Sequence, residues 1–406
     1  VRVFPASEEE VSALLKYANE RGKSVSVEGN GSKRGFGGLR ESYDIALSLS
    51  KHAGIVEHQA GDMIVTVKAG TPFGELQDFL RRHRQQVPLD PALPHLSTIG
   101  GVIAANDSGP KRLGYGSARD AVLGLRVVYP DGTVIRTGGK VVKNVAGYDM
   151  NKLFIGSMGT LGVITEITLK LRPVPKAESV VLVSFGGNPE DAREFIVRIL
   201  DSVLEPVALE LLSPSMAERL TGNKALTLAV CFEDVEGAVA DQENRTVRLA
   251  PRSAGTKVLR GEEIPRFWER LSGIVPGGRA AAVQDPVTAA LKIGVKNMDV
   301  LPLLLECERL AERLQTGIAA HGGAGHGLCR AVLKGSPQNV EAAIREIRDF
   351  AEKRKGYAAA THLPFFLRQR VGVWGEVPGY LFLMEGIKNK IDPRRVLNDR
   401  RFIGGI

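Results

Sequence analysis

The sequence predicts an α+β fold with a boundary near residue 175, and three observations support that prediction. Residues 156–171 begin as a glycine-bearing turn and continue as a strictly alternating segment, in which Ile167, Leu169 and Leu171 share one face of a half-buried strand. The prolines of Pro173-Val-Pro-Lys then stop both strand pairing and helix. Beyond them, strand-like and helical segments alternate, and we interpret this part as helices over an antiparallel sheet.

The first part of the chain begins with a helix that leads to a candidate anion-binding turn. Ser7 and Glu10 form the pattern of a capping box, and apolar residues recur after them at helical spacing. A short strand at residues 24–27 then runs into Glu28-Gly-Asn-Gly-Ser-Lys. Successive backbone N–H groups in such a turn form a concave anion site, and Lys33 adds a positive charge suited to phosphate.

Three further glycine clusters occupy loop positions. The first is Thr98-Ile-Gly-Gly, which leads into a run of small residues and then Ser108-Gly. The second, at residues 114–120, precedes an apolar strand at residues 121–129. The third is the turn at residues 156–162. Its glycines lack Cβ atoms and permit positive φ, so a flat or bulky cofactor can approach the backbone there.

Other phosphate-binding and hydrolase motifs do not match this sequence. The segment from residue 29 begins like a dinucleotide fingerprint, but Arg34 stands where the third glycine is required. Gly22-Lys-Ser resembles the end of a Walker A loop, yet Tyr17 stands where its first glycine is required. Neither a Gly-x-Ser-x-Gly elbow nor a His-Glu-x-x-His pair occurs, which excludes serine hydrolases and zincins of those types.

The order and spacing of the glycine motifs resemble the FAD-binding domain of the vanillyl-alcohol oxidase / p-cresol methylhydroxylase (PCMH) superfamily. The matching segments are residues 27–32, 69–71, 98–101 and 156–165. Within this superfamily, the chain is most similar to the FAD-binding E subunits of bacterial glycolate oxidases. The segments that carry this closer resemblance are residues 96–101, 108–112, 142–149 and 152–156.

The resemblance implies a domain organisation. Residues 1–175 are expected to form a two-part PCMH-type FAD-binding domain, and residues 176–357 an α+β cap with an antiparallel sheet. Cap strands are expected at residues 179–185, 208–212, 226–232 and 291–296, and cap helices at residues 191–203, 264–271, 300–314 and 339–355. Residues 358–406, with a helix near 380–391, are expected to return to the FAD domain.

The resemblance also implies which residues hold the cofactor. Those expected to cradle the FAD pyrophosphate are Gly29, Asn30, Gly31, Ser32 and Lys33. Those expected to line the ribityl and isoalloxazine side are Thr98, Ile99, Gly100, Gly101, Ser108 and Gly109. Those expected to offer backbone groups are Gly116, Gly162 and Ile164. Relatives with covalent FAD attach it through His, Cys or Tyr near these loops. Residues 28–39 contain none of these three, so non-covalent FAD is expected.

Two histidines are candidate catalytic groups. Related FAD-dependent D-2-hydroxyacid dehydrogenases carry a Gly-His-Ala-Gly-Asp-Gly-Asn-Leu-His segment that supplies a metal-site and catalytic pair. Residues 319–329 keep His321 and His326, lack the Asp, and have Cys329 in place of the final His. The two imidazoles could still bind a metal or take a proton from a hydroxyacid; no metal is assigned, and either histidine is a candidate neutral-pH base. The alternative is a tight glycine turn between two strands.

Lys143 and Arg112 are the other catalytic candidates. A 2-hydroxyacid carries a carboxylate, which an ammonium or guanidinium group would pair with. The alternative is that these side chains pair with FAD phosphate or with a partner subunit.

The end of the sequence departs from the family pattern. Relatives end Asp-Pro…Leu-Asn-Pro-Gly, whereas here Asp392-Pro-Arg-Arg-Val-Leu-Asn398 is followed by Asp399-Arg400. The asparagine keeps its register but the tight Pro-Gly turn is missing, which argues against a contact between Asn398 and the flavin.

The charge composition limits the kinds of partner that we expect. The 54 basic and 46 acidic residues leave a net charge of +8, but no basic stripe with interleaved aromatic residues predicts nucleic-acid binding. The excess charge suits an acidic partner or peripheral contact with an anionic membrane, and no apolar run approaches the length of about 20 residues that spans a bilayer.

The three cysteines lack Cys-x-x-Cys spacing, which indicates a reducing cytoplasm. An iron–sulfur cluster, which usually takes four thiolates, must then lie in another chain.

The expected function is that of an FAD-binding subunit in a glycolate oxidase-like complex. Such a complex oxidises a 2-hydroxyacid, glycolate to glyoxylate, and its partners would be a second flavoprotein (D-type) and an iron–sulfur protein (F-type). One alternative is a self-sufficient FAD-dependent D-lactate or D-2-hydroxyacid dehydrogenase. The other is a non-catalytic scaffold subunit that has kept the fold without the flavin.

Overall fold

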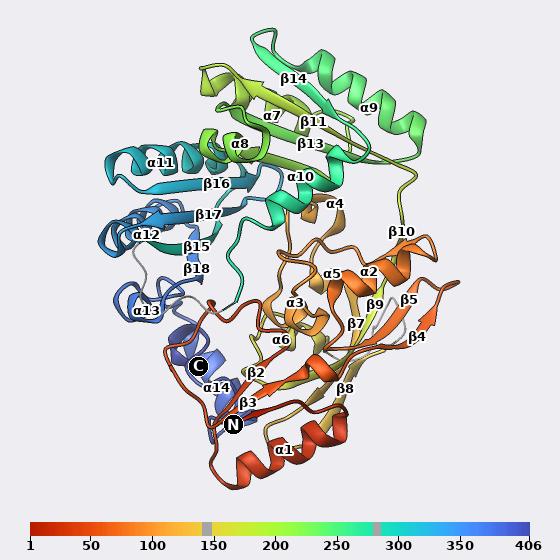
Figure 1. Cartoon of the computed structure of the whole chain (residues 1–406), viewed down its shortest axis with the longest axis vertical. Coiled ribbons are helices and arrows are strands. Elements are labelled where there is room, and N and C mark those ends of the chain that lie inside the picture. The colour runs from red at the N-terminus through yellow and green to blue at the C-terminus, as the bar shows by residue number, and fades with distance from the viewer. Residues whose placement is uncertain (140–147, 279–285) are drawn as a thin grey trace.

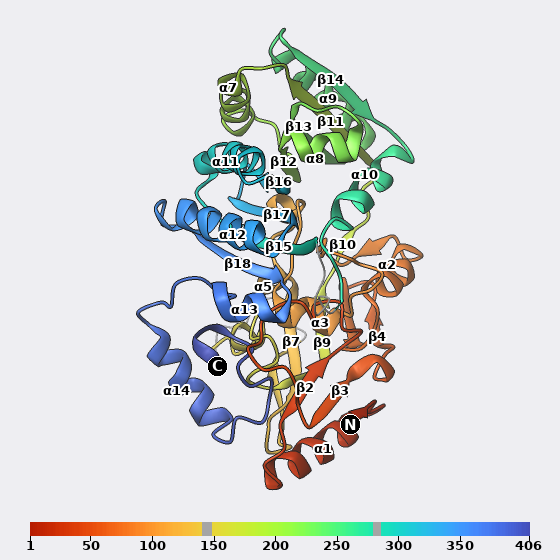
Figure 2. The ribbon, with the colours of Figure 1, turned by 60° about the vertical axis from the view of Figure 1, so that its left-hand side comes forward.

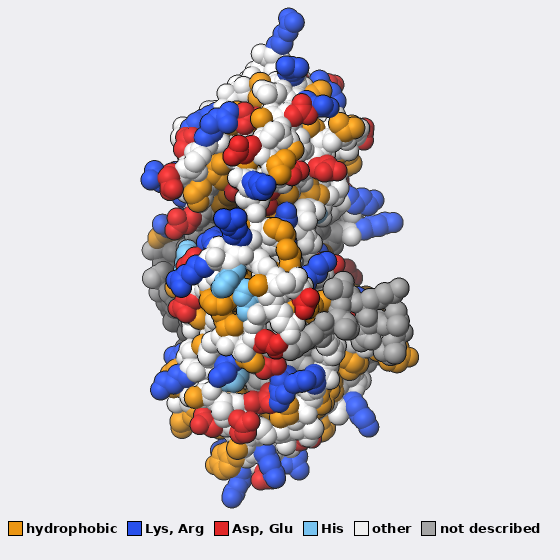
Figure 3. Space-filling view, turned by 90° about the vertical axis from the view of Figure 1, so that its right-hand side faces the viewer, with side chains coloured by type: hydrophobic (Ala, Val, Ile, Leu, Met, Phe, Trp, Pro, Cys, Tyr) orange, Lys and Arg blue, Asp and Glu red, His pale blue; other side chains and the backbone are white. Residues whose placement is uncertain are grey.

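The protein is an elongated molecule with two lobes (Figure 1). We call the lobe that contains the N-terminus the FAD-domain lobe, after the cofactor that the resemblance implies, and the other the cap lobe. The computed structural model describes residues 1–139, 148–278 and 286–406. In this part of the chain, no helix is both long enough and apolar enough to cross a membrane. On the face that Figure 3 shows, Lys and Arg side chains lie interspersed with Asp and Glu.

The FAD-domain lobe contains two main sheets. A parallel sheet has the order β1-β3-β2, and an antiparallel sheet has the order β4-β5-β9-β7-β8. The strands are β1 (Arg2–Val3), β2 (Val25–Glu28), β3 (Ile45–Ser48), β4 (Ile55–Gln59), β5 (Ile64–Lys68), β7 (Val122–Val128), β8 (Val134–Gly138) and β9 (Val163–Lys170). The helices are α1 (Glu8–Glu20), α2 (Phe73–Arg81), α3 (Ile99–Ala105), α4 (Arg112–Tyr115), α5 (Ala118–Ala121) and α6 (Asn151–Phe154). A small ribbon pairs β6 (Gln85–Gln86) with β10 (Arg172–Pro173).

Local signals in this lobe are largely confirmed. Ser7 caps α1 by accepting a hydrogen bond from the Glu10 N–H at 3.2 Å, but the Glu10 carboxylate accepts from the N–H of Ala6, so the expected capping box is only half formed. Strand β9 has the expected alternation, since Ile167 and Leu169 are buried while Lys170 is exposed. Helix α3 differs from the expected loop: despite its glycines and small residues, the segment is helical, and the Thr98 side chain caps it by accepting from the N–H of Gly101.

The cap lobe is built on one antiparallel sheet of eight strands, in the order β14-β11-β13-β12-β16-β17-β15-β18. Its strands are β11 (Ala177–Phe185), β12 (Ala208–Leu212), β13 (Leu226–Asp234), β14 (Ala254–Leu259), β15 (Val287–Gly294), β16 (Gly317–Gly323), β17 (Leu328–Gly335) and β18 (Tyr357–His362). Its helices are α7 (Pro189–Leu200), α8 (Pro214–Thr221), α9 (Glu236–Leu249), α10 (Glu263–Ser272), α11 (Val300–Arg313) and α12 (Pro337–Glu352). Helices on an antiparallel sheet make the α+β class that the sequence predicted.

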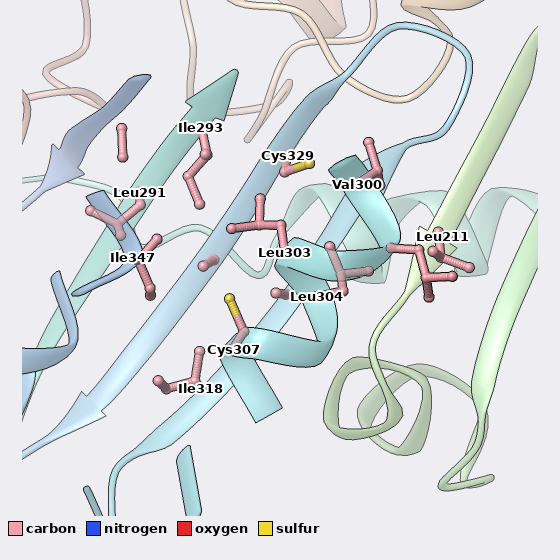
Figure 4. Packing of buried hydrophobic residues seen from close by; sticks show 14 of the residues in the cluster. Leu211, Leu291, Ile293, Val300, Leu303, Leu304, Cys307, Ile318, Cys329 and Ile347 are labelled. Atoms are coloured by element: carbon pink, nitrogen blue, oxygen red, sulfur yellow. The ribbon is translucent and has the colours of Figure 1, made fainter. Parts of the chain in front are cut away.

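Helix α11 covers one face of the central cap strands (Figure 4). Leu303, Leu304 and Cys307 from this helix pack against the sheet residues Leu291 and Ile318 in one buried cluster. Because side chains alternate along a strand, the neighbours of these core residues point to the opposite face of the sheet. That opposite face carries the polar residues of the candidate site.

The C-terminal segment runs from the cap to the FAD-domain lobe, and its helix α14 lies on the outside of the molecule (Figure 2). Helices α13 (Phe365–Val371) and α14 (Leu381–Ile391) precede a turn that joins the parallel sheet. The Val25 N–H donates to the carbonyl of Val396 at 2.7 Å, and the Asn398 N–H donates to the carbonyl of Val25 at 2.9 Å. The end of the chain is therefore fixed to the strand that carries the first glycine loop.

Candidate functional site

A cleft lies where the FAD-domain loops meet the C-terminal segment. Its lining includes Gly29, Asn30, Gly31, Ser32, Lys33, Thr98, Gly100, Gly101, Gly162 and Ile164, which are ten of the predicted cofactor residues. The structure thus brings together loops that lie far apart in the sequence.

Glycines allow these loops to pack closely around the cleft. A Cβ atom on Gly29 would lie 2.0 Å from Oγ1 of Thr98, and one on Gly100 would lie 2.8 Å from the carbonyl oxygen of Ala69. Gly31 has a φ of +76°, a conformation that favours glycine. Larger residues at these positions would push apart the walls of the cleft.

The turn after β2 fits an anionic cofactor. The backbone N–H groups of residues 29–33 have no acceptor in the part of the chain that the structure describes. A run of main-chain donors of this kind suits the diphosphate of FAD. Lys33 differs from the expectation, because its Nζ already pairs with Oδ2 of Asp107 at 3.2 Å.

The other predicted cofactor residues lie elsewhere. Ile99 is fully buried in the core of the FAD-domain lobe. Ser108 and Gly109 line a different cavity, closer to the cap. Gly116 ends α4 and faces Asp120 rather than the cleft. The predicted catalytic residue Lys143 lies outside the described residues.

The C-terminal segment contributes two residues to the cleft that the sequence analysis did not assign. Asn398 lines it, although the Pro-Gly turn of the family pattern is missing. Its side chain accepts a hydrogen bond from the N–H of Val27 at 2.9 Å and donates one to the carbonyl of Met158 at 2.8 Å. Arg401 also lines the cleft. The sequence signal for the place of Asn398 in the cleft was that it matches the asparagine of the family pattern Leu-Asn-Pro-Gly.

A row of polar side chains crosses four neighbouring cap strands. Lys292 on β15 stands opposite Arg330 on β17, and Arg330 stands opposite His321 on β16. Glu210 on the next strand, β12, is a diagonal neighbour of His321, close enough for long side chains to meet. The alternation in Leu291-Lys-Ile293 could have identified Lys292, whereas nothing local identifies the partner of Glu210.

His321 and Glu210 form a buried pair. Nδ1 of His321 lies 2.5 Å from Oε1 of Glu210, and both residues are almost inaccessible to solvent. Nε2 of His321 is buried and has no partner among the described residues. If Nδ1 carries the proton toward the carboxylate, Nε2 presents a free lone pair, which is the form of a general base.

His326 is near this pair but is bound differently. It lies in the turn between β16 and β17, where Nδ1 accepts a hydrogen bond from the N–H of Leu328 at 3.2 Å. Gly323 makes room for its ring, because a Cβ there would lie 2.0 Å from a ring carbon of His326. Burial lowers the pKa of His326, so its neutral form is favoured. The glycine turn between two strands, given above as the alternative, is present together with the histidine pair.

Positive charge accumulates beside the histidines. Arg330 donates to Oδ1 of Asp107 at 2.7 Å and to the carbonyl of Ser108 at 2.8 Å. Burial disfavours the Asp107 carboxylate, but Lys33 and Arg330 outweigh that effect and hold its pKa below the usual range. Burial and the neighbouring Arg330 also lower the pKa of Lys292 to about 8. Lys33, Lys292 and Arg330 thus all interact with the Asp107 carboxylate.

Arg112 adds to this positive potential without lining the cavity. Its Nη1 donates to the hydroxyl of Ser108 at 3.0 Å, and its charge lowers the pKa of Lys292 together with burial and Arg330. Arg112 therefore lies near the site and acts on Lys292 through its charge, without lining the cavity.

Small cavities lie between the cleft and the histidine pair. One shares Ser32 and Lys33 with the cleft, and its far side is lined by Lys292 and Arg330. The next is lined by the same two cations together with Glu210, His321 and His326. A small molecule between them would contact both the cations and the imidazoles.

Comparisons with known proteins agree with this geometry. Residues 1–138 match a family described as an FAD binding domain. The p-cresol methylhydroxylase structure aligns with a TM-score of 0.75 at 16% identity, over 98% of this chain and 88% of that one. The chain therefore has a PCMH-type FAD-binding fold, and its cofactor is FAD, as predicted. Non-covalent attachment stays a prediction.

Curated relatives include a dehydrogenase and an oxidase subunit, in agreement with the oxidoreductase class that the sequence predicted. A mitochondrial D-lactate dehydrogenase [cytochrome] of Arabidopsis thaliana is 35% identical over 65% of this chain and 47% of its own length. The glycolate oxidase subunit GlcE of Escherichia coli is 40% identical over 41% of this chain and 48% of its own length. In both matches the aligned part spans about half the length of the relative.

Proposed function

We propose that this chain is an FAD-dependent dehydrogenase of a small 2-hydroxyacid such as D-lactate or glycolate. The observation that carries the proposal is the row of Lys292, Arg330 and His321 across the cap sheet, with Glu210 behind the imidazole. Cavities adjoin this row on one side and the FAD cleft on the other. A carboxylate-bearing substrate between them would meet every group that the oxidation requires.

The cations would select and orient the substrate. Lys33, Lys292 and Arg330 surround only one carboxylate, Asp107, which leaves net positive charge in a partly buried space. A desolvated cation is stabilised by an anion, so the carboxylate of a 2-hydroxyacid suits this position. Arg330 is already oriented by Asp107 and Ser108, whereas among the described residues the one hydrogen bond of Lys292 is a long contact of 3.5 Å to the carbonyl of Asn106. Lys292 is therefore the first choice for the substrate carboxylate.

His321 would take the hydroxyl proton. Its Nε2 is unpartnered within the described chain, and Glu210 would stabilise the imidazolium that forms. Bound FAD would accept the hydride from C2, so the 2-hydroxyacid loses two electrons and two hydrogens and becomes a 2-oxoacid. Burial of the pair keeps water from competing for the proton.

A second candidate is a catalytic or electron-relaying subunit of a glycolate oxidase-like complex. The likeness to GlcE over 171 residues favours it, together with a likeness to the glycolate oxidase subunit GlcD of Bacillus subtilis, which is 27% identical over 98% of this chain. Under this proposal, a D-type flavoprotein and an F-type iron–sulfur protein would be the partners. The unpartnered N–H groups of residues 29–33 argue against a scaffold that has lost its flavin.

The visible spectrum of the purified chain tests the proposal. Under anaerobic conditions, D-lactate or glycolate should bleach the bound flavin, with L-lactate as the stereochemical control. A flavin that no 2-hydroxyacid bleaches would overturn the self-sufficient dehydrogenase. Bleaching that appears only when partner subunits are added would support the complex.

A further inference from the structure

The C-terminal segment brings a cation to the FAD cleft. Arg401 lines the cleft, and its Nη2 donates to the carbonyl of Lys33 at 3.1 Å. Its guanidinium therefore lies beside the turn at residues 29–33, whose backbone N–H groups have no acceptor within the described residues.

The other cations of the cleft already have carboxylate partners. Lys33 pairs with Asp107, as described above. Arg34 forms an ion pair with Glu28 and donates to the hydroxyl of Ser26 at 2.6 Å. In contrast, Arg401 forms no ion pair with any described residue, and its Nε atom is buried without a partner. Burial and the neighbouring Arg34 lower the pKa of Arg401 to about 10, as expected for a cation that lacks an anion.

We propose that Arg401 binds the diphosphate of FAD. The diphosphate is the charged part of the cofactor, and the donors at residues 29–33 provide only neutral groups for it. A guanidinium with a free N–H beside those donors supplies the missing positive charge. This inference rests on FAD binding alone and does not depend on the substrate.

The segment holds Arg401 in position through its backbone. The carbonyl of Arg401 accepts hydrogen bonds from the N–H of Gly38 and from Nε1 of Trp374, each at 3.2 Å. Its own N–H donates to the carbonyl of Asn398 at 3.0 Å. Because the backbone is fixed and Nη2 is already bound to the carbonyl of Lys33, the guanidinium loses less conformational freedom on meeting a phosphate than that of an exposed arginine would.

Binding of cofactor fragments tests the proposal. Flavin-free chain would be titrated with FAD, ADP and riboflavin, with fluorescence quenching for the flavins and calorimetry for ADP. Arg401→Gln should bind FAD and ADP about tenfold to a hundredfold more weakly, because a charge-assisted hydrogen bond is lost, and should bind riboflavin as the wild type does. Arg401→Lys should recover part of the affinity for ADP.

Arg400→Gln is the matched control, because Arg400 is the exposed neighbour and the substitution removes the same charge. The proposal is overturned if Arg401→Gln binds ADP as tightly as Arg400→Gln does. It is also overturned if the affinity for riboflavin falls as much as that for FAD, since that result would mean general damage to the cleft. Higher salt should weaken ADP binding less in Arg401→Gln than in the wild type.

Discussion

Lys388 and Asp392 form a fully buried ion pair, with Nζ of Lys388 2.7 Å from Oδ2 of Asp392. The ammonium also donates to the carbonyls of Thr160 at 2.7 Å and Leu397 at 3.0 Å. The carboxylate in turn accepts the N–H groups of Val396 and Leu397. This pair ties α14 to the glycine turn before β9 and sets the backbone that leads to Asn398 and Arg401.

Lys388→Met should strongly destabilise the protein. The substitution leaves the Asp392 carboxylate buried without its cation, and breaking a buried pair in this way costs about 3–5 kcal/mol. Urea unfolding of the flavin-loaded chain measures the loss. Lys390→Met, at an exposed position on the same helix, should change the free energy of unfolding little. Equal effects of the two substitutions would contradict the role of the pair.

A second buried cation joins the FAD-domain lobe to the cap. Nζ of Lys111 lies 2.7 Å from a carboxylate oxygen of Glu178 and 2.6 Å from one of Glu233, which are on β11 and β13. Lys111→Met should lower the free energy of unfolding by about 3 kcal/mol, since the buried Glu233 carboxylate and the partly buried Glu178 carboxylate would lose their nearest cation. Fluorescence of Trp268 reports the change, because its Nε1 donates to Glu178. Lys257→Met, which breaks a surface pair with Glu263, should have little effect.

Substrate affinity should depend on pH through Lys292. Its pKa of about 8 means that the ammonium is lost as the pH rises through that value. The KM for D-lactate should therefore rise between pH 7 and 9.5, by up to about tenfold per pH unit once above the pKa. Lys292→Arg keeps its charge throughout and should flatten the profile. A wild-type KM that stays constant over this range would exclude Lys292 as the carboxylate partner.

The free energy of unfolding should increase with pH because of Lys292, whereas substrate affinity should decrease. An unfolded lysine has a pKa of about 10.4, so between pH 8 and 10.4 the unfolded state binds more protons at this position than the folded state. The contribution of Lys292 to the free energy of unfolding therefore rises with pH in that window. The difference in unfolding free energy between wild type and Lys292→Met, measured at pH 7.5 and 10, should shift in favour of the wild type at the higher pH.

Local features of the fold could be predicted because they depend on local chemistry. Gly31 and Gly159 have φ values of +76° and +70°, and no distant residue is needed to expect a turn there. Gly162 belongs to the same turn as Gly159 but does not adopt a positive φ. It allows close packing instead, since a Cβ there would lie 2.5 Å from Cγ1 of Val127. The alternation of β9 was equally local.

The acid–base pair could not be predicted because strand pairing creates it. Glu210 meets His321 only because β12 lies beside β16 in a sheet whose order does not follow the sequence. The turn near Asn398 shows a different limit. Asn398 and Arg400 adopt positive φ values of 44° and 61° without glycine, so the missing Pro-Gly pair did not remove the turn.

The rate at which D-lactate bleaches the bound flavin in a single anaerobic turnover tests the central claim most directly. His321→Gln should slow bleaching about 10²- to 10⁴-fold while the flavin spectrum remains, because the proton acceptor is lost. Glu210→Gln should slow it less, and His326→Gln least, because Nδ1 of His326 accepts the N–H of Leu328 in place of the contact with Glu210 that orients His321. A His321→Gln chain that bleaches at the wild-type rate would contradict the assignment of this buried pair as the catalytic base.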